Sequence, residues 1–334
     1  MLDHAKYHPA WWLPGPNLQT LWAARVSRPP VVTYRPERLE LPDGDFVDLA
    51  WAGDPGAPLI VVLHGLEGSA ESPYVRRLVQ ALITRGYGTC VMHFRGCSGT
   101  PNRLARSYHS GDTGDLKFLL DTLQARLPNR ALGAVGYSLG GNVVLKFLGE
   151  LGSRTSLVAA AAVSVPFDLA AAASRLNQGF SRIYQRHLVS SMRTKLKRKF
   201  SDVAAPIDLT HLHRWRTFWE YDEHVTAPLH GFASAADYYA QSSSRNFIKR
   251  ITIPTLVVHA LDDPFLPASA VPLEHEIVAS ITFELVARGG HVGFVMPHLK
   301  AVTNSWLERR LLAHFEETIP LSHATSARMH ANPI

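Results

Sequence analysis

The stretch GAVGYSLGGN, residues 133–142, runs from small apolar residues into a serine that stands between two glycines. Gly136, Ser138 and Gly140 match the pattern G-x-S-x-G, in which a serine occupies a sharp turn between a strand and a helix. Glycines on both sides let the neighbouring backbone approach without Cβ clashes. The same residues would also serve simply to end a strand and begin a helix. By itself, therefore, the stretch leaves a nucleophilic and a purely structural interpretation of Ser138 open.

The segments around this turn alternate between apolar runs and helix-like stretches. Runs that predict buried strands cover residues 57–65, 88–96, 131–138, 157–166, 253–263 and 281–288, and residues 46–53 alternate as an exposed strand does. Helical spacing falls between them, at 73–87, 111–128, 140–152, near 272–280 and at 299–315. Strands that alternate with helices predict an α/β fold: a doubly wound, mostly parallel sheet with helices on both faces.

Residues 166–250 interrupt this alternation. The stretch is long for a connection and mostly helical in pattern, so we expect a helical lid or cap inserted into the core. We accordingly divide the chain into an N-terminal arm packed on the core (1–40), an α/β core (41–165 and 251–318), the insertion (166–250) and a tail (319–334).

Within the insertion, residues 183–200 have the spacing of an amphipathic helix. Apolar side chains are predicted on one face and basic ones on the other: Ile183, Leu188, Met192, Leu196 and Phe200 opposite Arg186, Arg193, Lys197 and Arg198. We favour a lid helix whose apolar face packs on the core and whose charged face is solvated. A weak peripheral contact between this helix and a membrane surface is the alternative.

The composition, with 46% hydrophobic and 19% charged residues, is that of a soluble globular protein. No apolar run reaches the roughly 20 residues that cross a bilayer, and because no apolar stretch follows a basic start at the N-terminus, we expect no secretory signal. The two cysteines, Cys90 and Cys97, fit a reducing compartment, so we expect a cytoplasmic protein. The net charge of +6 is spread along the chain apart from residues 193–199, which predicts no nucleic-acid partner. Nothing in the pattern indicates an oligomeric state.

A serine needs a base to become a nucleophile, and the base needs a third group to orient it. In one large class of hydrolases with a G-x-S-x-G turn, the acid and then the histidine follow the serine along the chain. Here Asp263 ends one late strand-like run and His291 follows the next. Both therefore stand at carboxyl ends of strands, at the edge of the sheet where Ser138 also stands. We predict that Ser138, Asp263 and His291 form a catalytic triad.

Two neighbouring aspartates compete for the acidic position. Asp263 precedes the turn PFLP, residues 264–267, which suits a carboxylate held in place, whereas we expect Asp262 to have a turn or capping role. His291 lies in GGHVGF, where the glycines suit a mobile loop that brings an imidazole to the serine. The chain has 17 histidines, and His291 is distinguished among them by its position.

Acyl transfer also needs N–H donors for the oxyanion. One is expected from Leu139, the residue after the serine, at the start of a helix. The second is expected from Leu66, in the loop HGLEG, residues 64–68, after an early buried strand. His64 is expected to brace this loop without touching a substrate.

No cofactor or metal site is predicted. His211 and His213 have no further ligand at a convincing spacing, which argues against zinc. The chain has no G-x-x-x-x-G-K-[ST] phosphate loop, and GYSLGGN does not have the G-x-G-x-x-G spacing of a dinucleotide site.

Several segments together resemble the YheT-like family of α/β-hydrolase-fold esterases and lipases, which is related to the eukaryotic abhydrolase-domain lipases. The matching segments are WWLPGPNLQTLWA (11–23), VVLHGLEGSAESPY (61–74), HFRGCSGTPNRLARSYHSGDTGDL (93–116), GYSLGGNVVLKFLGE (136–150), VSVPFDL (163–169), ALDDPFLP (260–267) and GGHVGF (289–294). They occur in the family's order, with Asn17 where the family usually has a histidine.

This resemblance implies an α/β-hydrolase fold and a serine hydrolase that cleaves carboxylic esters, as esterases and lipases do, through an acyl-enzyme on Ser138. Asp263 and His291 would complete the triad, and the insertion would cover the substrate pocket. The partner would be a small-molecule ester or lipid substrate. Two alternatives stay open: an acyltransferase in which an alcohol acceptor replaces water, and a non-catalytic binding module of the same fold.

Overall fold

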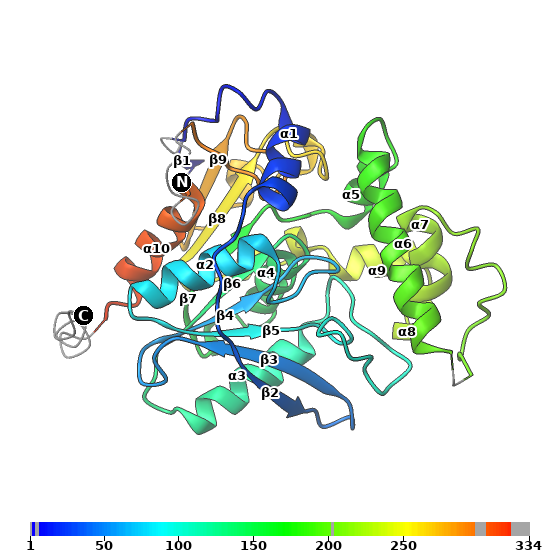
Figure 1. Ribbon diagram of the computed structural model, residues 1–334, viewed down its shortest axis with the longest axis horizontal. Helices are drawn as coiled ribbons and strands as arrows, with labels where there is room; N and C mark the ends of the chain where they lie inside the picture. Colours follow the sequence, from blue (N-terminus) through cyan, green and yellow to red (C-terminus); the bar gives the residue numbers. More distant parts are fainter. Residues whose placement is uncertain (1, 4–6, 202–203, 298–304, 322–334) are drawn as a thin grey trace.

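The computed structural model describes residues 2–3, 7–201, 204–297 and 305–321 (Figure 1). In this part of the chain nine strands form one sheet, in the order β1-β9-β8-β7-β6-β4-β5-β3-β2. The strands are β1 (Leu2–Asp3), β2 (Arg35–Glu40), β3 (Phe46–Ala52), β4 (Leu59–Leu63), β5 (Gly88–Met92), β6 (Leu132–Tyr137), β7 (Leu157–Val163), β8 (Thr255–Ala260) and β9 (Ile281–Val286).

The sheet is parallel from β1 across to β5, and β3 and β2 add an antiparallel pair at the far edge. Every residue of β4, β5, β6 and β8 is buried, because helices cover both faces of these central strands. The predicted doubly wound and mostly parallel sheet is therefore confirmed.

Helices cover both faces of the sheet (Figure 1). The apolar side chains of α2 and α10 pack in one buried layer, and those of α3 and α4 pack in the other. These helices are α2 (Pro73–Thr84), α3 (Gly114–Arg126), α4 (Leu139–Leu151) and α10 (Trp306–Thr318). Short 3-10 turns lie in the connections: η2 (Gly152–Arg154), η4 (Ser244–Asn246), η5 (Ile248–Arg250), η6 (Ala268–Ala270) and η7 (Glu274–Glu276).

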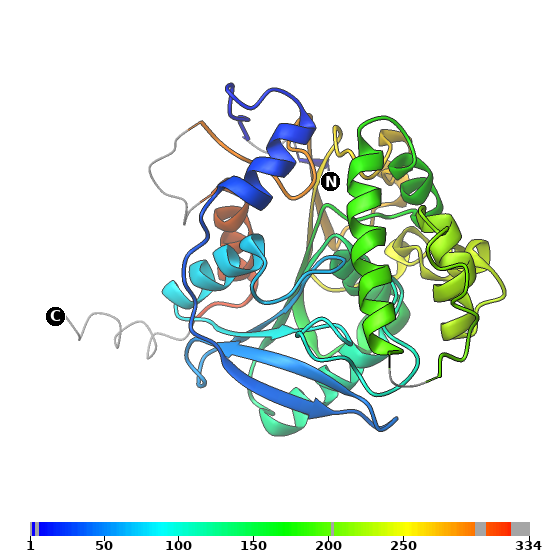
Figure 2. The ribbon, with the colours of Figure 1, turned by 45° about the vertical axis from the view of Figure 1, so that its right-hand side comes forward.

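Between β7 and β8 the chain forms a group of helices beyond one end of the sheet, which Figure 2 shows with the long helix α6 toward the viewer. They are α5 (Leu169–Leu176), α6 (Ser181–Lys199), α7 (Phe218–Tyr221), the π-helical turn η3 (Asp222–Thr226), α8 (Ala227–His230) and α9 (Ala235–Ser242). We call residues 166–250 the helical insertion. It has its own apolar cluster, which includes Leu169, Val189, Trp215 and Tyr238.

Helix α6 is amphipathic as predicted, but its buried side is turned relative to the predicted stripe. Leu196 is buried, whereas Ile183 is 56% exposed. The fully packed side instead carries Val189 and two polar residues, Ser181 and Gln185. These polar side chains have partners, since Ser181 Oγ donates to Pro264 O at 2.7 Å and Gln185 Oε1 accepts the Phe218 N–H at 3.1 Å. Because Ser181 and Gln185 form hydrogen bonds, they can be buried on this helix, whereas Ile183, which was predicted to be buried, is exposed.

The N-terminal arm is more regular than its composition indicates. Pro16–Leu21 form α1, which continues as the π-helical turn η1 (Trp22–Val26), and the last six residues of the arm are the edge strand β2. Strand β3, expected to be exposed, is largely buried because it lies between β2 and β5.

Two differences concern the end of the chain. The helix expected near 272–280 is only the three-residue turn η7, where the Glu276 carboxylate accepts the Leu273 N–H and also binds Arg245. At the expected tail, Ile319 is buried and its carbonyl accepts the Tyr87 hydroxyl at 2.9 Å. Residues 299–304 of the expected last helix and 322–334 of the tail lie outside the described residues.

No described helix has both the length and the apolar character needed to cross a membrane.

Candidate active site

Ser138 stands on the turn between β6 and α4. Its backbone has φ 51° and ψ −116°, a conformation that L-residues rarely adopt, and its N–H donates to Val163 O at 2.8 Å. A Cβ at Gly136 would collide with the backbone of Gly140, and a Cβ at Gly140 would lie 2.6 Å from Leu63 O. Both glycines are therefore needed for the turn, which does end a strand and begin a helix while it presents the serine.

The loop after β8 gives its two aspartates different partners. Asp263 is 3% exposed, and its Oδ1 accepts the Phe265 N–H at 2.8 Å. Burial would raise the pKa of Asp263, but the His291 imidazole, together with His259 and the Phe265 N–H, outweighs burial and holds that pKa below its usual value. Asp262 Oδ1 instead accepts the N–H groups of residues 289–290, each at 2.9 Å. The turn or capping role expected for Asp262 is thus a bridge between the two loops.

His291 lies between Ser138 and Asp263. Its Nδ1 is 2.8 Å from Asp263 Oδ2, and its Nε2 is 3.0 Å from Ser138 Oγ. Because an ionised carboxylate can only accept, Nδ1 carries the proton, and Nε2 is free to accept the serine hydroxyl. The imidazole also stacks on the ring of Phe265, with centroids 3.9 Å apart and 1° between the planes. The structure therefore brings the three predicted side chains together.

The N-terminal arm holds the histidine loop, a contact that sequence reasoning missed. The His291 N–H donates to Thr20 Oγ1 at 2.9 Å, and the Val295 N–H donates to Gln19 Oε1 at 2.8 Å. A Cβ at Gly290 would collide with a backbone carbonyl at the start of α1. The only sequence signal for Thr20 and Gln19 was their position in the segment WWLPGPNLQTLWA, which carries the family resemblance without indicating their role.

The two amides expected to bind an oxyanion lie beside the serine turn. Leu139 is the first residue of α4, so its N–H has no intrahelical acceptor. The N–H groups on either side of Leu66 are engaged with tyrosine hydroxyls, at 2.8 and 3.0 Å, whereas that of Leu66 has no acceptor among the described residues. A Cβ at Gly65 would lie 3.3 Å from Ser138 Cβ, so this loop packs directly against the serine.

His64 braces the same loop, as expected. Its Nδ1 is 2.7 Å from Gly65 O, and its Nε2 accepts the Phe94 N–H at 3.2 Å. Burial lowers the pKa of His64 to about 3, so the imidazole is neutral and keeps one donor and one acceptor for these two bonds.

Three cavities meet near Ser138. An apolar pocket runs beneath the insertion and is lined by residues that include Ser138, His291, Leu169, Ala173, Leu176 and Leu266. A groove between the arm and α6 also reaches the serine, past Thr20, Leu21, Tyr184 and Leu188. A third, more polar cavity adjoins the apolar pocket at Leu66 and Leu139. A bound ester would thus have an apolar pocket on one side of the serine and openings on others.

The described residues contain no group of three or more His, Cys, Asp and Glu side chains that could hold a metal ion. His211 and His213, the pair considered for zinc, are both exposed.

A serine on a strand-to-helix turn, an acid after β8 and a histidine after β9 are the arrangement that defines the α/β hydrolases. Comparison with known proteins agrees: the family described as alpha/beta hydrolase fold matches residues 58–296. The chain is 43% identical to the YheT protein of Escherichia coli strain K12 over 301 residues, which cover 88% of each protein. It is 28% identical to the mouse phospholipase ABHD3, covering 86% of this chain and 73% of that protein.

The fold comparison points the same way. An esterase from Pyrococcus furiosus superposes with a TM-score of 0.57 at 16% identity, covering 96% of this chain and 98% of that one, which is a likeness of fold alone. The chain therefore belongs to the α/β-hydrolase family, and within it to the YheT-like branch.

Proposed function

We propose that this protein is a serine hydrolase that cleaves carboxylic esters through an acyl-enzyme on Ser138. The observation that carries the proposal is the continuous line of hydrogen bonds from Ser138 Oγ through His291 to Asp263, at 3.0 and 2.8 Å. The esterase name of the Escherichia coli relative supports an ester substrate, and the phospholipase name of the mouse relative supports a lipid one.

In the first half of the reaction, His291 Nε2 takes the hydroxyl proton as Ser138 Oγ attacks the ester carbonyl carbon. The carbonyl oxygen becomes an oxyanion that accepts from the Leu66 and Leu139 N–H groups, and such donors contribute about 10²–10³ in rate each. Asp263 orients the imidazole and stabilises its positive charge. The tetrahedral intermediate then collapses, and His291 gives the proton to the departing alcohol.

In the second half, water enters beside His291, loses a proton to Nε2 and attacks the acyl carbon. Collapse of this intermediate releases the carboxylic acid, and the proton returns to Ser138 Oγ. An alcohol in place of water would give a new ester, which is the acyltransferase alternative.

The first test is Ser138→Ala, measured with p-nitrophenyl esters of short to long acyl chains. We expect activity to fall to background while the circular dichroism spectrum is unchanged, because the change removes only the hydroxyl oxygen of the nucleophile. Ser190→Ala, at an exposed serine on α6, is the matched control and should keep full activity. Cleavage that persists in purified Ser138→Ala would rule out the assignment.

A fluorophosphonate probe distinguishes the proposed serine hydrolase from a non-catalytic binding module. Labelling of the wild type at Ser138, and not of Ser138→Ala, is expected for an activated serine. A wild type that is neither labelled nor active would instead be a binding module. Product analysis with added alcohol measures how much acyl group is transferred to the alcohol and how much to water.

A cytoplasmic location is part of the same proposal. Cys90 and Cys97 are both free and buried, as thiols are in proteins of a reducing compartment.

A further inference from the structure

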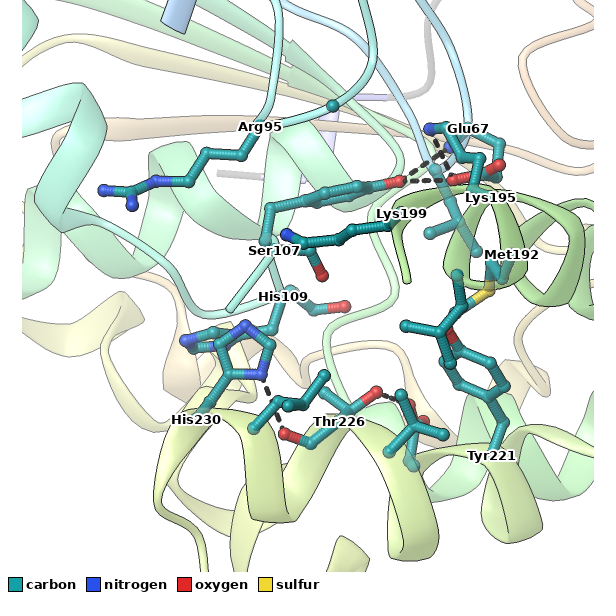
Figure 3. A pocket seen from close by; sticks show the side chains of 18 of the residues that line it. Glu67, Arg95, Ser107, His109, Met192, Lys195, Lys199, Tyr221, Thr226 and His230 are labelled. Carbon is teal, nitrogen blue, oxygen red and sulfur yellow. Dashed lines mark hydrogen bonds and ion pairs between the residues drawn. The ribbon is translucent and has the colours of Figure 1, made fainter. Parts of the chain in front are cut away.

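The polar cavity beside the active site is lined by cationic side chains that the proposed reaction does not use. It lies between the C-terminal half of α6, the loop around residues 95–110 and the helices α7 and α8 (Figure 3). It shares Leu66 and Leu139 with the apolar pocket that holds Ser138. The residues proposed to bind the oxyanion are therefore also the boundary of this second cavity.

Three cations enter the cavity from α6, and they differ in their partners. Lys195 Nζ is 2.9 Å from Glu67 Oε1, so its charge is neutralised. Lys199 Nζ donates only to neutral oxygens, Asn102 Oδ1 at 2.6 Å and Arg106 O at 2.8 Å. Within the described part of the chain, Lys199 forms no ion pair with a carboxylate.

The third cation, Arg198, lies at the edge of the cavity and, like Lys199, donates to a neutral oxygen. Its guanidinium donates to Gly99 O at 3.1 Å, and no described carboxylate pairs with it. The side of the cavity formed by α6 thus carries the charge of Lys199 and Arg198 with no carboxylate of the described residues in direct contact. Asp45 raises the pKa of Lys199 through space, but its carboxylate binds Arg95 and Asn102.

Lys199 is half-buried, so its charged ammonium group has lost part of its hydration without gaining a carboxylate partner within the described ranges. Burial lowers the pKa of Lys199 to about 8, because neutral hydrogen-bond partners replace only part of the hydration of an ammonium group. An anion that entered the cavity would restore a favourable partner for this group.

The remaining polar groups of the cavity do not neutralise these cations. His109 and His230 lie on the side of α8 (Figure 3), and burial lowers the pKa of both, so they are neutral. Arg95 points away from the centre of the cavity in the same view, and its guanidinium is held by three aspartates.

Asp222 is the acidic residue on the far wall. Its two carboxylate oxygens already accept the hydroxyls of Thr226, at 2.5 Å, and Tyr239, at 2.7 Å. Burial raises the pKa of this carboxyl to about 6.

The cations follow, along α6, a residue that lines the cavities of the serine. Leu188 lines the groove and the apolar pocket together with Ser138, and Lys195 and Lys199 follow it on the same helix. At 1.5 Å of rise per residue, they lie about 10 and 16 Å further along α6. A substrate of moderate length could therefore have its ester at Ser138 and its other end in the cationic cavity.

We propose that this cavity binds an anionic group, a phosphate or a carboxylate, carried by the ester whose carbonyl reacts at Ser138. The inference rests on the proposed ester hydrolysis and adds its substrate class: esters that carry a negative charge several bonds away from the scissile bond. Lys199 is the residue that recognises the anion, with Lys195 and Arg198 beside it.

Two pairs of substrates test the preference and locate the anion. The first pair is 1-octanoylglycerol and 1-octanoylglycerol 3-phosphate, which differ by a phosphate on the alcohol side. The second is p-nitrophenyl octanoate and mono-p-nitrophenyl octanedioate, which differ by a carboxylate on the acyl side. In at least one pair, we expect kcat/KM of the anionic member to be about ten- to a hundredfold higher, as for a hydrogen bond between charged groups.

Variants on α6 identify the source of the preference. Lys199→Met should reduce the preference to near unity, and its circular dichroism spectrum should match that of the wild type, which reports an intact fold. Lys199→Arg should keep a preference, and Lys195→Met should weaken it. Lys197→Met removes the same charge from an exposed position on the same helix and should have no effect.

Three results would overturn the inference: equal rates within both pairs, a preference that survives Lys199→Met, or a preference that Lys197→Met abolishes as well. Cleavage of the neutral esters without any anion preference would reject this inference and leave the proposed hydrolase intact. If Ser138 takes no fluorophosphonate label and none of the four esters is cleaved, the proposed function fails and the inference fails with it.

Discussion

At the scale of single residues, the adjacent aspartates show how one position along a loop separates two roles. Asp263 and Asp262 are both acidic, and both follow β8. Asp263 faces the imidazole of His291, whereas Asp262 bonds to the backbone of residues 289–290. One is therefore in contact with the imidazole of His291, and the other fixes the loop that carries His291.

Replacing each aspartate by asparagine should separate these roles. Asp263→Asn is expected to lower kcat by about 10⁴, because an amide cannot hold the imidazole in the required tautomer. Asp262→Asn should lower kcat less than about tenfold, since an amide oxygen still accepts both N–H groups. Steady-state kinetics with p-nitrophenyl butyrate measures both effects. A larger fall in kcat for Asp262→Asn than for Asp263→Asn would show that Asp263 is not the acid of the triad.

Residue 262 also allows a graded comparison. Asp262→Ala removes both bonds to the histidine loop and should cost more activity than Asp262→Asn. Its rate of fluorophosphonate labelling should fall in parallel with kcat, because both reactions need His291 in place.

At the scale of elements, the arm and the histidine loop act as one unit although they are distant in sequence. Besides Thr20 and Gln19, the hydroxyl of Tyr7 donates to Val295 O at 3.0 Å, and the Ala10 N–H donates to the same oxygen at 2.8 Å. The arm also contacts α6, where the Tyr184 hydroxyl donates to Asn17 Oδ1 at 3.1 Å. Asn17 thus joins the arm to the insertion.

Thr20→Val is expected to lower kcat about tenfold with little change in KM. The valine cannot accept the His291 N–H, and leaving this one donor unpaired costs about 1–3 kcal/mol. Thr122→Val is the matched control, because each threonine also donates to a carbonyl four residues earlier in its helix. Thr122 lies on α3, away from the histidine loop, so its replacement should leave kcat unchanged. Equal losses in the two variants would show that only helix stability was affected.

At the scale of the whole molecule, the parallel core was predictable from sequence because its signals are local. Each central strand is a continuous apolar run, and each core helix shows helical spacing. Carboxyl ends of parallel strands share one edge, so the meeting of Ser138, Asp263 and His291 followed from the order of strands and motifs.

What could not be predicted depends on contacts between distant segments. The hydrogen bond from His291 to Thr20 spans 271 residues, and no periodicity signals it. Strand β2 has an exposed, charged pattern and is fixed by its pairing with β3, as edge strands commonly are. The cationic cavity was hidden for the same reason, since Lys199 meets Asn102 and Arg106 only once α6 has packed on the core.

The insertion is fixed to the core by a buried polar link. The Asn142 amide, on α4, donates to Ser110 O at 2.8 Å and to Ser242 O at 2.7 Å, and it accepts the Ser244 N–H at 2.9 Å. Three segments thus meet at one buried side chain behind the serine turn. The position of the insertion over the site is therefore coupled to the stability of the whole fold.

Asp222 makes that stability depend on pH. Burial raises its pKa to about 6 in the folded protein, against about 3.9 in an unfolded chain. The folded state therefore binds this proton more tightly, and the contribution of Asp222 to stability falls as pH rises from about 4 to about 6. Asp222→Asn stays neutral, and its amide can still bond both hydroxyls, so its free energy of unfolding at pH 7 should exceed that of the wild type by up to about 3 kcal/mol.

Urea unfolding of the wild type and Asp222→Asn at a series of pH values measures this difference. The advantage of the variant should be small at pH 4, grow between pH 4 and 6 and stay constant above, because only the wild-type carboxyl ionises in that range. Asp121→Asn, at an exposed carboxylate on α3, corrects for the change in net charge and should show no such growth. A variant that is equally destabilised at every pH would mean that the amide disrupts the bonds to Thr226 and Tyr239, and that the charge of Asp222 does not set the stability of the insertion.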